Sequence, residues 1–402
     1  MTAAARTTRP GPLAPAMDLG GLITDPETRI IVCCGSGGVG KTTTSAALAL
    51  AAAEAGRTVV VLTIDPARRL AQSLGLEELD NEPRRVEVPG ADGELHAMML
   101  DMKRTFDDVV AAHSTPERAQ AILDNPFYQS LSSSFSGTQE YMAMEKLGQL
   151  RATDQWDLII VDTPPSRSAL DFLDAPNRMS RFLDGTMIRL LTGGGRAGLK
   201  FASAGFMIFS RIVSKILGGQ LLRDISAFVA ALDTMFGGFR ERATATYELL
   251  RRPGTWFVVV ASPEPDALRE ASYFVDRLSA DGMPLAGLVL NRTHPPATTA
   301  LSATRAEAAA EEVAESGAEG SDVTAAALRV HAERMVVAAR EQHLADRFTS
   351  AHPEVAVRTV PAAAGDVHDL EGLRVMAGEL TGADADTPTG TPRTRVLPAR
   401  RG

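Results

Sequence analysis

The chain has 402 residues, of which 45% are apolar, and its 50 Asp and Glu outnumber its 41 Lys and Arg for a formal charge of −9. That length is enough for one large domain or about two, with an ample core. The negative balance argues against a protein that coats nucleic acid by neutralising phosphates, so we expect no nucleic-acid partner.

The positions of the cysteines and the lack of long apolar runs further restrict the class of protein to which the chain can belong. The two cysteines, Cys33 and Cys34, are adjacent, which rules out a disulfide framework and any Cys-x-x-Cys zinc or redox site. The N-terminus lacks the apolar stretch of a signal peptide, and no apolar run is long enough to span a membrane. We therefore expect a cytoplasmic protein that at most touches a membrane surface.

Both ends of the chain have few apolar side chains that a core could bury. Residues 1–28 and 381–402 are rich in Pro, Thr, Gly and Arg, which predicts disordered tails. Between them, short β-branched runs alternate with helical patterns. The runs lie at 29–34, 57–64, 95–100, 156–162, 255–262, 284–291 and 355–360. Continuous apolarity within strands and strand-helix alternation predict an α/β fold with a doubly wound, mostly parallel sheet.

Two segments interrupt this alternation. Residues 177–250 show only helical pattern with glycine-rich joints, which predicts an inserted helical subdomain between two parts of one α/β domain, 29–176 and 251–380. Residues 298–322 are rich in Ala and Glu without a wide apolar stripe, which indicates a solvated helix or a loose linker.

A glycine-rich turn follows the first predicted strand. It reads Gly35-Ser36-Gly37-Gly38-Val39-Gly40-Lys41-Thr42, fits the pattern G-x-x-x-x-G-K-[ST] and precedes a predicted helix. Its glycines let successive backbone N–H groups point at phosphate oxygens, and the helix start adds positive potential. We expect Lys41 to neutralise the terminal phosphates and Thr42 to ligate Mg²⁺. The alternative is a glycine-rich turn without a ligand.

Hydrolysis of a bound nucleotide also needs a carboxylate for the metal and a group that positions water. Asp162 ends the strand at 158–161, where it would hold Mg²⁺ through water; the alternative is a cap on the following turn. Asp65 closes the strand at 57–64, but Asp followed by Pro66 is also an ordinary helix start.

Taken together, the ordered motifs of this chain resemble the ArsA-like ATPases, a family that includes the bacterial arsenite-pump ATPase and the eukaryotic ATPase that targets tail-anchored membrane proteins. The motifs are GSGGVGKTT, TIDPARRLA, SGTQEYMAMEKL, VDTPPS and VLNR. The resemblance covers about residues 30–380. It implies a P-loop NTPase fold with a deviant Walker A motif and an ATP-bound form that closes as a dimer.

The resemblance also implies roles for individual residues. Residues 37–43, ending in Thr43, would bind the phosphates and Mg²⁺, and Asp65 would orient or deprotonate the attacking water. Asp162 would begin switch II. Asn291 would read adenine, although an Asn at a strand end is also an ordinary turn residue, and Pro361 would lie in the loop beside adenine.

Three departures from the family pattern matter. Ser36 replaces the Lys that reaches across the dimer to the partner's phosphates, so a homodimer should hydrolyse ATP slowly unless Arg68 or Arg69 substitutes. Switch II continues as Ser166-Arg167-Ser168 instead of Gly and His. The cysteines that bind zinc or arsenite in the family are absent, so arsenite binding has no chemical basis here.

We therefore predict a Mg²⁺-dependent ATPase that works as a homodimer or as a heterodimer with a Lys-bearing paralogue. The insertion 177–250 has basic residues beside apolar stretches, which is typical of helices that meet a protein client or a membrane surface; it could equally just cap the sheet. Two alternatives remain. One is a weakly hydrolysing ATP-switch subunit of a hetero-oligomer, and the other is a P-loop kinase for a small acceptor.

Overall fold

A computed structural model describes residues 15–65, 69–126, 129, 139–164, 241–296 and 298–382. Within these residues, eight strands form one sheet in the order β3-β4-β2-β5-β1-β6-β7-β8. The strands are β1 (Ile30–Cys34), β2 (Thr58–Thr63), β3 (Arg84–Val86), β4 (Glu94–Met99), β5 (Leu158–Asp162), β6 (Thr255–Ala261), β7 (Leu285–Thr293) and β8 (Val357–Pro361). Every neighbouring pair is parallel except β3 and β4.

The predicted α/β fold with a mostly parallel sheet is therefore confirmed, and all seven predicted strands are present. The short antiparallel strand β3 at the sheet edge was not predicted, because its three residues include two arginines and are only partly buried. Strands β1 and β5, in the middle of the sheet, are buried at every position. This explains their continuous apolar sequence, since helices cover both faces.

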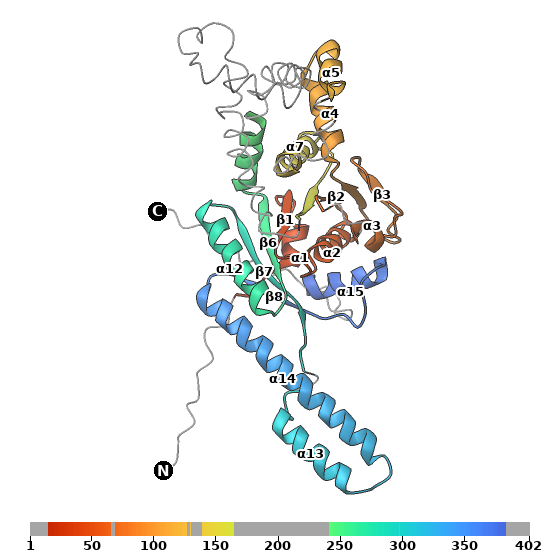
Figure 1. The fold of residues 1–402 in the computed structure, drawn as a ribbon, viewed down its shortest axis with the longest axis vertical. Helices are drawn as coiled ribbons and strands as arrows, with labels where there is room; N and C mark the ends of the chain where they lie inside the picture. The colour runs from red at the N-terminus through yellow and green to blue at the C-terminus, as the bar shows by residue number, and fades with distance from the viewer. Residues whose placement is uncertain are drawn as a thin grey trace, which may run out of the picture.

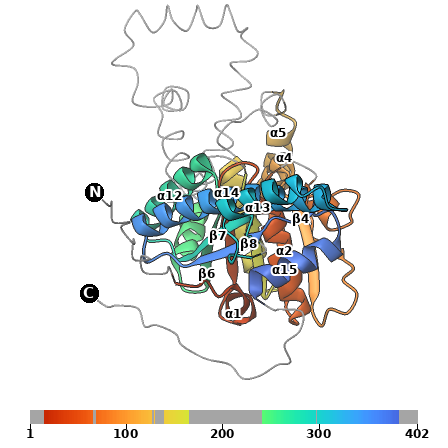
Figure 2. The same ribbon diagram turned by 90° about the horizontal axis from the view of Figure 1, so that it is seen from below.

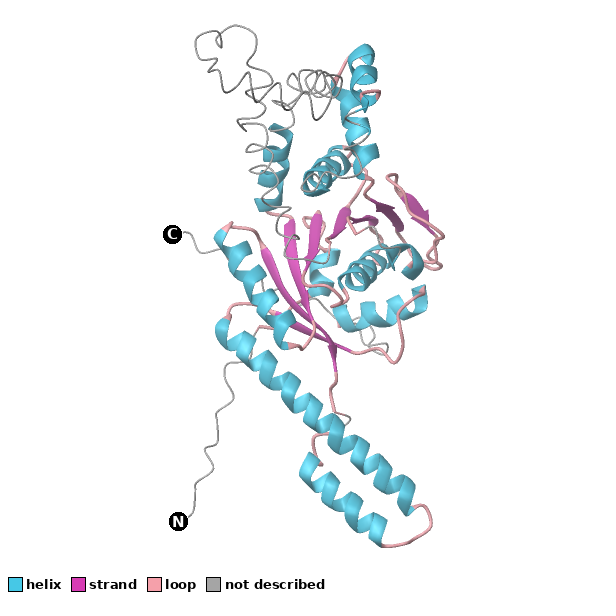
Figure 3. Cartoon of the chain, in the orientation of Figure 1, coloured by secondary structure: helices cyan, strands magenta, loops and turns pink. Residues whose placement is uncertain are grey.

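The described helices surround the sheet or extend from it (Figures 1 and 3). They are α1 (Leu19–Thr24), α2 (Lys41–Glu54), α3 (Arg69–Ser73), α4 (Met102–His113), α5 (Pro116–Leu123), α7 (Gln139–Ala152), α12 (Pro265–Ala280), α13 (Ala303–Glu315), α14 (Ser321–Ala351) and α15 (Leu370–Thr381). The connection through α2 runs from β1 toward β2, whereas that through α12 runs from β6 in the opposite direction to β7. Right-handed crossovers therefore place α2 and α12 on opposite faces.

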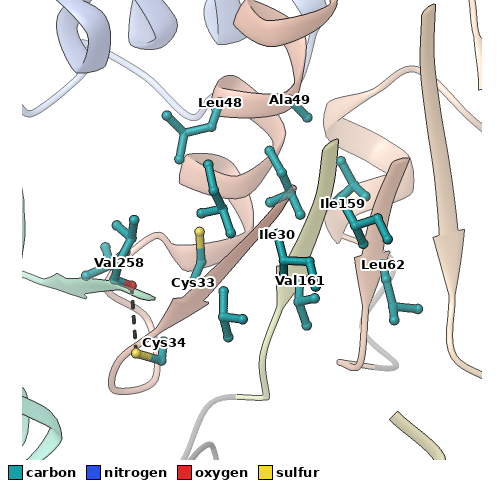
Figure 4. Close-up of a cluster of buried hydrophobic side chains, with 14 of the residues drawn as sticks. Ile30, Cys33, Cys34, Leu48, Ala49, Leu62, Ile159, Val161 and Val258 are labelled. Atoms are coloured by element: carbon teal, nitrogen blue, oxygen red, sulfur yellow. Dashed lines mark hydrogen bonds between the residues drawn. The ribbon is translucent and has the colours of Figure 1, made fainter. Parts of the chain in front are cut away.

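The centre of the core lies between α2 and the middle strands (Figure 4). Leu48 and Ala49 of α2 are fully buried against strand residues such as Ile30 and Ile159. The two cysteines belong to this core, both buried and unbonded to each other, and the Cys34 thiol donates to the Val258 carbonyl at 3.7 Å. Burial raises the pKa of both thiols, which keeps them protonated and inert.

The expectation of a disordered tail up to residue 28 is wrong for its second half. Residues 19–24 form α1, whose Leu19 and Ile23 are buried, and Asp18 caps the helix by accepting a hydrogen bond from Gly21 N at 2.8 Å. The segment before it pairs with the start of β8, where Val357 N donates to the Pro15 carbonyl at 2.9 Å. A few apolar side chains suffice here because α1 packs against α2 and α15.

Several other expectations concern residues outside the described ranges. Residues 1–14 and 383–402 of the predicted tails are among them, and so are residues 177–240 of the predicted insertion. Its last part, 241–250, is helical as expected. The division into an α/β domain and an insertion remains a prediction.

The Ala- and Glu-rich run proves to be half of a helical hairpin. Ser302 caps α13, α14 follows after a short turn, and the two helices pack side by side. Figure 1 shows the hairpin extending away from the sheet, and in the view from below the two helices lie in front of the strands (Figure 2). The run is thus an ordered helix rather than a loose linker. Among the helices that the structure describes, none is both long enough and apolar enough to cross a membrane.

Candidate functional site

The glycine-rich turn lies between β1 and α2, as its motif requires. Gly35 has a φ of +150° and passes so close to β6 that a Cβ there would collide with the Val260 carbonyl oxygen. Gly40 has a φ of +95° and leads directly into α2. A side chain at Gly40 would meet the amide nitrogen of Asn291. Both glycines are therefore required by the backbone, which brings N–H groups and the α2 N-terminus to one place.

Lys41 is the first residue of α2, and only 5% of it is exposed. Its ammonium group donates a hydrogen bond to the Ser36 carbonyl at 2.7 Å, inside the same turn. Burial lowers the pKa of Lys41, while the nearby carboxylates of Asp162 and Asp65 oppose that effect. A buried cation flanked by carboxylates and backbone N–H groups suits a polyanionic ligand that arrives with its own metal ion.

Asp162 is fully buried at the end of β5, between the ends of β1 and β2. Its Oδ2 accepts hydrogen bonds from the hydroxyl groups of Thr42 at 2.8 Å and Thr63 at 3.0 Å. Burial raises the pKa of Asp162 to about 6, although these hydrogen bonds and the charge of Lys41 act against it. The predicted pair of Thr42 and Asp162 is thus brought together by adjacent parallel strands.

The second oxygen of this carboxylate fits the predicted metal ion. Asp162 Oδ1 is buried and has no hydrogen-bond partner among the described residues. Such an unpaired buried oxygen is costly unless a ligand completes it. A hydroxyl and a carboxylate are oxygen donors of the kind that Mg²⁺ prefers, and Mg²⁺ usually keeps several waters and takes few protein ligands. The residues present therefore fit Mg²⁺.

Asp65 lies two residues beyond β2 and is half-buried. Its backbone N–H donates to the hydroxyl group of Thr63 at 3.3 Å, so one threonine contacts both predicted carboxylate positions. The alternative role of Asp65 as a helix cap involves residues 66–68, which lie outside the described ranges.

A cleft of about 1260 Å³ joins the predicted site residues. It is bounded by the glycine-rich turn and α2, by the ends of β7 and β8, by the loop 362–369 and by α15. Among the residues that line it are Gly38, Gly40, Lys41, Thr42, Thr43, Asp65, Arg69, Asn291, Arg292, Pro361 and His368. Pockets for small ligands commonly measure about 300–1,000 Å³, so a nucleoside triphosphate fits.

Asn291 is on β7, which lies on the other side of β1 from β2, the strand that Asp65 follows. Its side-chain amide donates to the Val39 carbonyl at 2.9 Å, and 5% of the residue is exposed. The residue therefore ties β7 to the glycine-rich turn. Pro361 ends β8 next to it and lines the same cleft. The structure places both predicted adenine residues at one end of the cleft, and their contacts to adenine remain predictions.

With this geometry in hand, comparison with known proteins decides the class. A family profile described as anion-transporting ATPase (ArsA ATPase) matches residues 28–316. The chain belongs to this ATPase family. As a member of the ArsA ATPase family, it is an ATP-binding protein and an ATP hydrolase.

Several relatives share a large part of the chain at modest identity. The ATPase GET3 of Malassezia globosa is 27% identical over 271 residues, which is 66% of this chain and 73% of the relative. The ATPase GET3 of Paracoccidioides lutzii is 30% identical over 245 residues, or 58% of this chain and 67% of the relative. The ATPase ASNA1 homolog of Babesia bovis is 24% identical and covers 68% of this chain and 69% of its own.

Other features of this ArsA-family cleft were not foreseen from sequence. Thr63, which holds Asp162, is one of many threonines, and its only signal is its place at a strand end beside a motif aspartate. One face of α15 lines the cleft with Gly372, Val375 and Met376. His368 has its Nδ1 2.7 Å from the Asp366 carbonyl oxygen in the cleft wall.

Within the described residues, no group of three or more His, Cys, Asp and Glu side chains is arranged to hold a metal ion. Arg69, one of the two candidate substitutes for the missing lysine at position 36, is exposed and lines the cleft. The other, Arg68, lies outside the described ranges, as do the switch II departures at 166–168.

Proposed function

We propose that this ATPase hydrolyses Mg-ATP in the cleft and that its nucleotide state switches a dimer between open and closed forms. The observation that carries the proposal is the contact between Thr42, at the start of α2, and Asp162, at the end of β5. It lies next to Lys41, where the metal and phosphates of ATP would be bound. An exposed turn without a ligand would not need a fully buried carboxylate beside it.

Each protein group has a distinct part in this proposal. Thr42 and Asp162 hold Mg²⁺, which when bound neutralises charge on the phosphates. Lys41 and the N–H groups of residues 37–43 stabilise the charge that develops on the transferred phosphoryl group. Asp65 orients the attacking water and accepts its proton. Asn291 and Pro361 bind the adenine end.

Ser36 sets the rate at which the proposed dimer hydrolyses ATP. The family's lysine at this position acts on the partner's nucleotide, and such a cation is worth about 10³–10⁵ in rate, judged from arginine fingers. In this chain the backbone carbonyl of Ser36 accepts a hydrogen bond from Lys41, and the Ser36 side chain carries no positive charge. We propose that a homodimer is slow and that a paralogue with the lysine, or Arg69 of this chain, completes the faster site. The alternative function, an ATP switch with little turnover, rests on the same residue.

Hydrolysis would be coupled to a partner through residues 177–250. Their basic and apolar composition supports a protein client or a membrane surface, and we place the protein in the cytoplasm, at most at the periphery of a membrane. The client is defined only by this chemistry: an apolar segment or an acidic surface.

Calorimetry and a phosphate-release assay on the full chain test the proposal. We expect Mg-ATP to bind to the wild type and to Asp65→Asn, and hydrolysis to be lost in Asp65→Asn alone. Ser36→Lys should raise turnover by at least 10-fold, and Ser36→Ala serves as its matched control. Absence of Mg-ATP binding by folded wild type would refute the site. Turnover by Asp65→Asn at the wild-type rate would refute the role of Asp65.

A further inference from the structure

Arg292 has an unusual backbone conformation at the edge of the cleft. Its φ is +62°, in the left-handed region that costs a residue with a side chain about 1–2 kcal/mol. It is also an extra residue in the strand: Asn291 pairs with Val360 of β8 and Thr293 pairs with Pro361, so Arg292 has no partner across the ladder. Such bulges are rare in parallel pairs and often re-aim a side chain next to a site.

The bulge has a direct effect on what faces the cleft. In a regular strand, consecutive side chains point to opposite faces of the sheet. Asn291 and Arg292 are consecutive, yet both line the cleft. The bulge and the left-handed conformation at Arg292 thus allow two consecutive residues to line the same cleft.

The guanidinium group has no protein partner that would explain this strain. In the part of the chain that the structure describes, the guanidinium group of Arg292 makes no hydrogen bond and no ion pair, and the residue is exposed. Lys41, by contrast, is buried and hydrogen-bonded within the glycine-rich turn. An unpaired cation held in the cleft by a strained backbone is suited to a ligand rather than to the fold.

The sheet order indicates which part of a nucleotide Arg292 would meet. The glycine-rich turn follows β1, and β7 lies two strands away from it, or roughly 10 Å at ~4.8 Å per strand. Asp162, on β5, lies on the opposite side of β1. A triphosphate held at the turn and at Asp162 therefore directs its base toward β7 and β8. The cleft wall there includes the apolar residues Val360, Pro361, Val375 and Met376, and the acidic Asp366 and Glu379 also line the cleft.

We propose that Arg292 packs its planar guanidinium group against the face of the nucleobase and makes no essential contact with the phosphates. Guanidinium groups stack well on aromatic rings, and an apolar surround strengthens that contact. This inference rests on the proposed Mg-ATP site and adds to it a base-binding residue.

The test compares ligands with and without a base on the full chain. Arg292→Asn removes the guanidinium group while keeping a residue that tolerates the left-handed conformation. We expect it to weaken Mg-ATP binding about 10-fold in calorimetry and to leave inorganic tripolyphosphate, measured by competition against Mg-ATP, within twofold of the wild type. Arg292→Gly should behave in the same way while relieving the backbone strain, and its thermal stability should equal or exceed that of the wild type.

The controls separate stacking from charge. Arg269→Asn removes an exposed arginine on α12, outside the cleft, and should bind both ligands as the wild type does. Arg292→Lys keeps the charge without the planar group, so it should recover little of the lost ATP affinity. Wild-type ATP affinity in Arg292→Asn, an equal loss for tripolyphosphate, or full recovery by Lys would overturn the proposal. Failure of tripolyphosphate to compete in the wild type would instead refute the phosphate site itself.

Discussion

Two alanine-rich helices of this chain, α2 and α14, have opposite environments. In α2, ten of 14 residues are buried, because the sheet covers one side and α15 packs against another. In α14, five of 31 residues are buried, and Val323, Val330 and Val336 are 75%, 55% and 62% exposed. Alanine content therefore says that a segment is helical but not where the helix lies. The environment follows from the position of each helix relative to the sheet.

The difference has a consequence for function. The packing of α2 against the sheet and α15 fixes the position of Lys41 and Thr42 at its first turn, so the proposed phosphate site is held by the core. The hairpin of α13 and α14 is anchored mainly at its base, where α14 meets α12 and buries Leu344 and Phe348. Substitutions should accordingly affect catalysis and stability at α2 and have little effect along the outer part of α14.

The largest expected effect is at the first residue of α2. Lys41→Ala removes the buried cation that, in the proposed function, stabilises charge on the phosphoryl group, and we expect ATP turnover to fall by about 10³-fold or more. Arg340→Ala removes an exposed cation from α14 and should leave turnover of the isolated chain unchanged. Phosphate release at saturating Mg-ATP measures both. Equal losses of ATP turnover in the two variants would contradict the expectation that substitutions in α2 affect catalysis more than substitutions in α14.

A matched pair of truncations compares the two helices in stability. Leu48→Ala in α2 leaves a cavity at a fully buried position and should lower the free energy of unfolding by about 2–5 kcal/mol. Val330→Ala in α14 removes a 55% exposed side chain and should change it by about 0.5 kcal/mol or less. Urea unfolding followed by circular dichroism gives both values. A loss at Val330 as large as that at Leu48 would show that something covers the outer face of α14.

The third prediction concerns pH and the carboxylate beside α2. The pKa of Asp162 is raised by burial from its ordinary value of 3.8 to about 6, so between those values the folded state binds more protons than the unfolded state. Its contribution to stability should therefore fall by about 3 kcal/mol as pH rises from about 4 to about 6, and then level off. Asp162→Asn, which cannot ionise, should lack this fall.

The free energy of unfolding in urea should be measured for the wild type and for Asp162→Asn at several pH values. The difference between the two proteins reports on Asp162, because the other carboxylates titrate equally in both. Above pH 6 the variant should be the more stable of the two without Mg²⁺, and added Mg-ATP should favour the wild type. A difference that is independent of pH would show that Asp162 ionises normally.

The smallest effect is expected at the base of the hairpin. Glu341 of α14 accepts a hydrogen bond from His294 N at 2.7 Å, and its other oxygen lies 2.7 Å from His294 Nδ1. Glu341→Ala should cost about 1 kcal/mol and speed hydrogen exchange at the His294 amide, since it loses these contacts to the segment after β7. The exposed Glu333 on the same helix offers a control, Glu333→Ala, with no expected change.

Most of the fold could be predicted because its signals are local. Each of the seven predicted strands is a continuous apolar run, and burial on both faces is what such a run requires. The predictions of secondary structure failed where a segment is stabilised by residues that are distant in sequence. Residues 15–24 look like a tail until β8 is beside them, and β3 gains its strand only by pairing with β4. The candidate site depends on the sequence in the same way: the motifs predicted residues such as Lys41 and Asp162, whose roles remain predictions, whereas no motif pointed to Thr63 or Arg292.

The sequence by itself determined the glycine-rich turn, the strand-end carboxylates and the family, because these depend on residue type and spacing along a few consecutive positions. Only the tertiary structure decided that Asp162 meets Thr42 and Thr63, that Asn291 bonds to Val39, and that Arg292 turns into the cleft. Those contacts join positions on different strands. Strand order and a local bulge set them, and neither is encoded in the neighbouring residues alone.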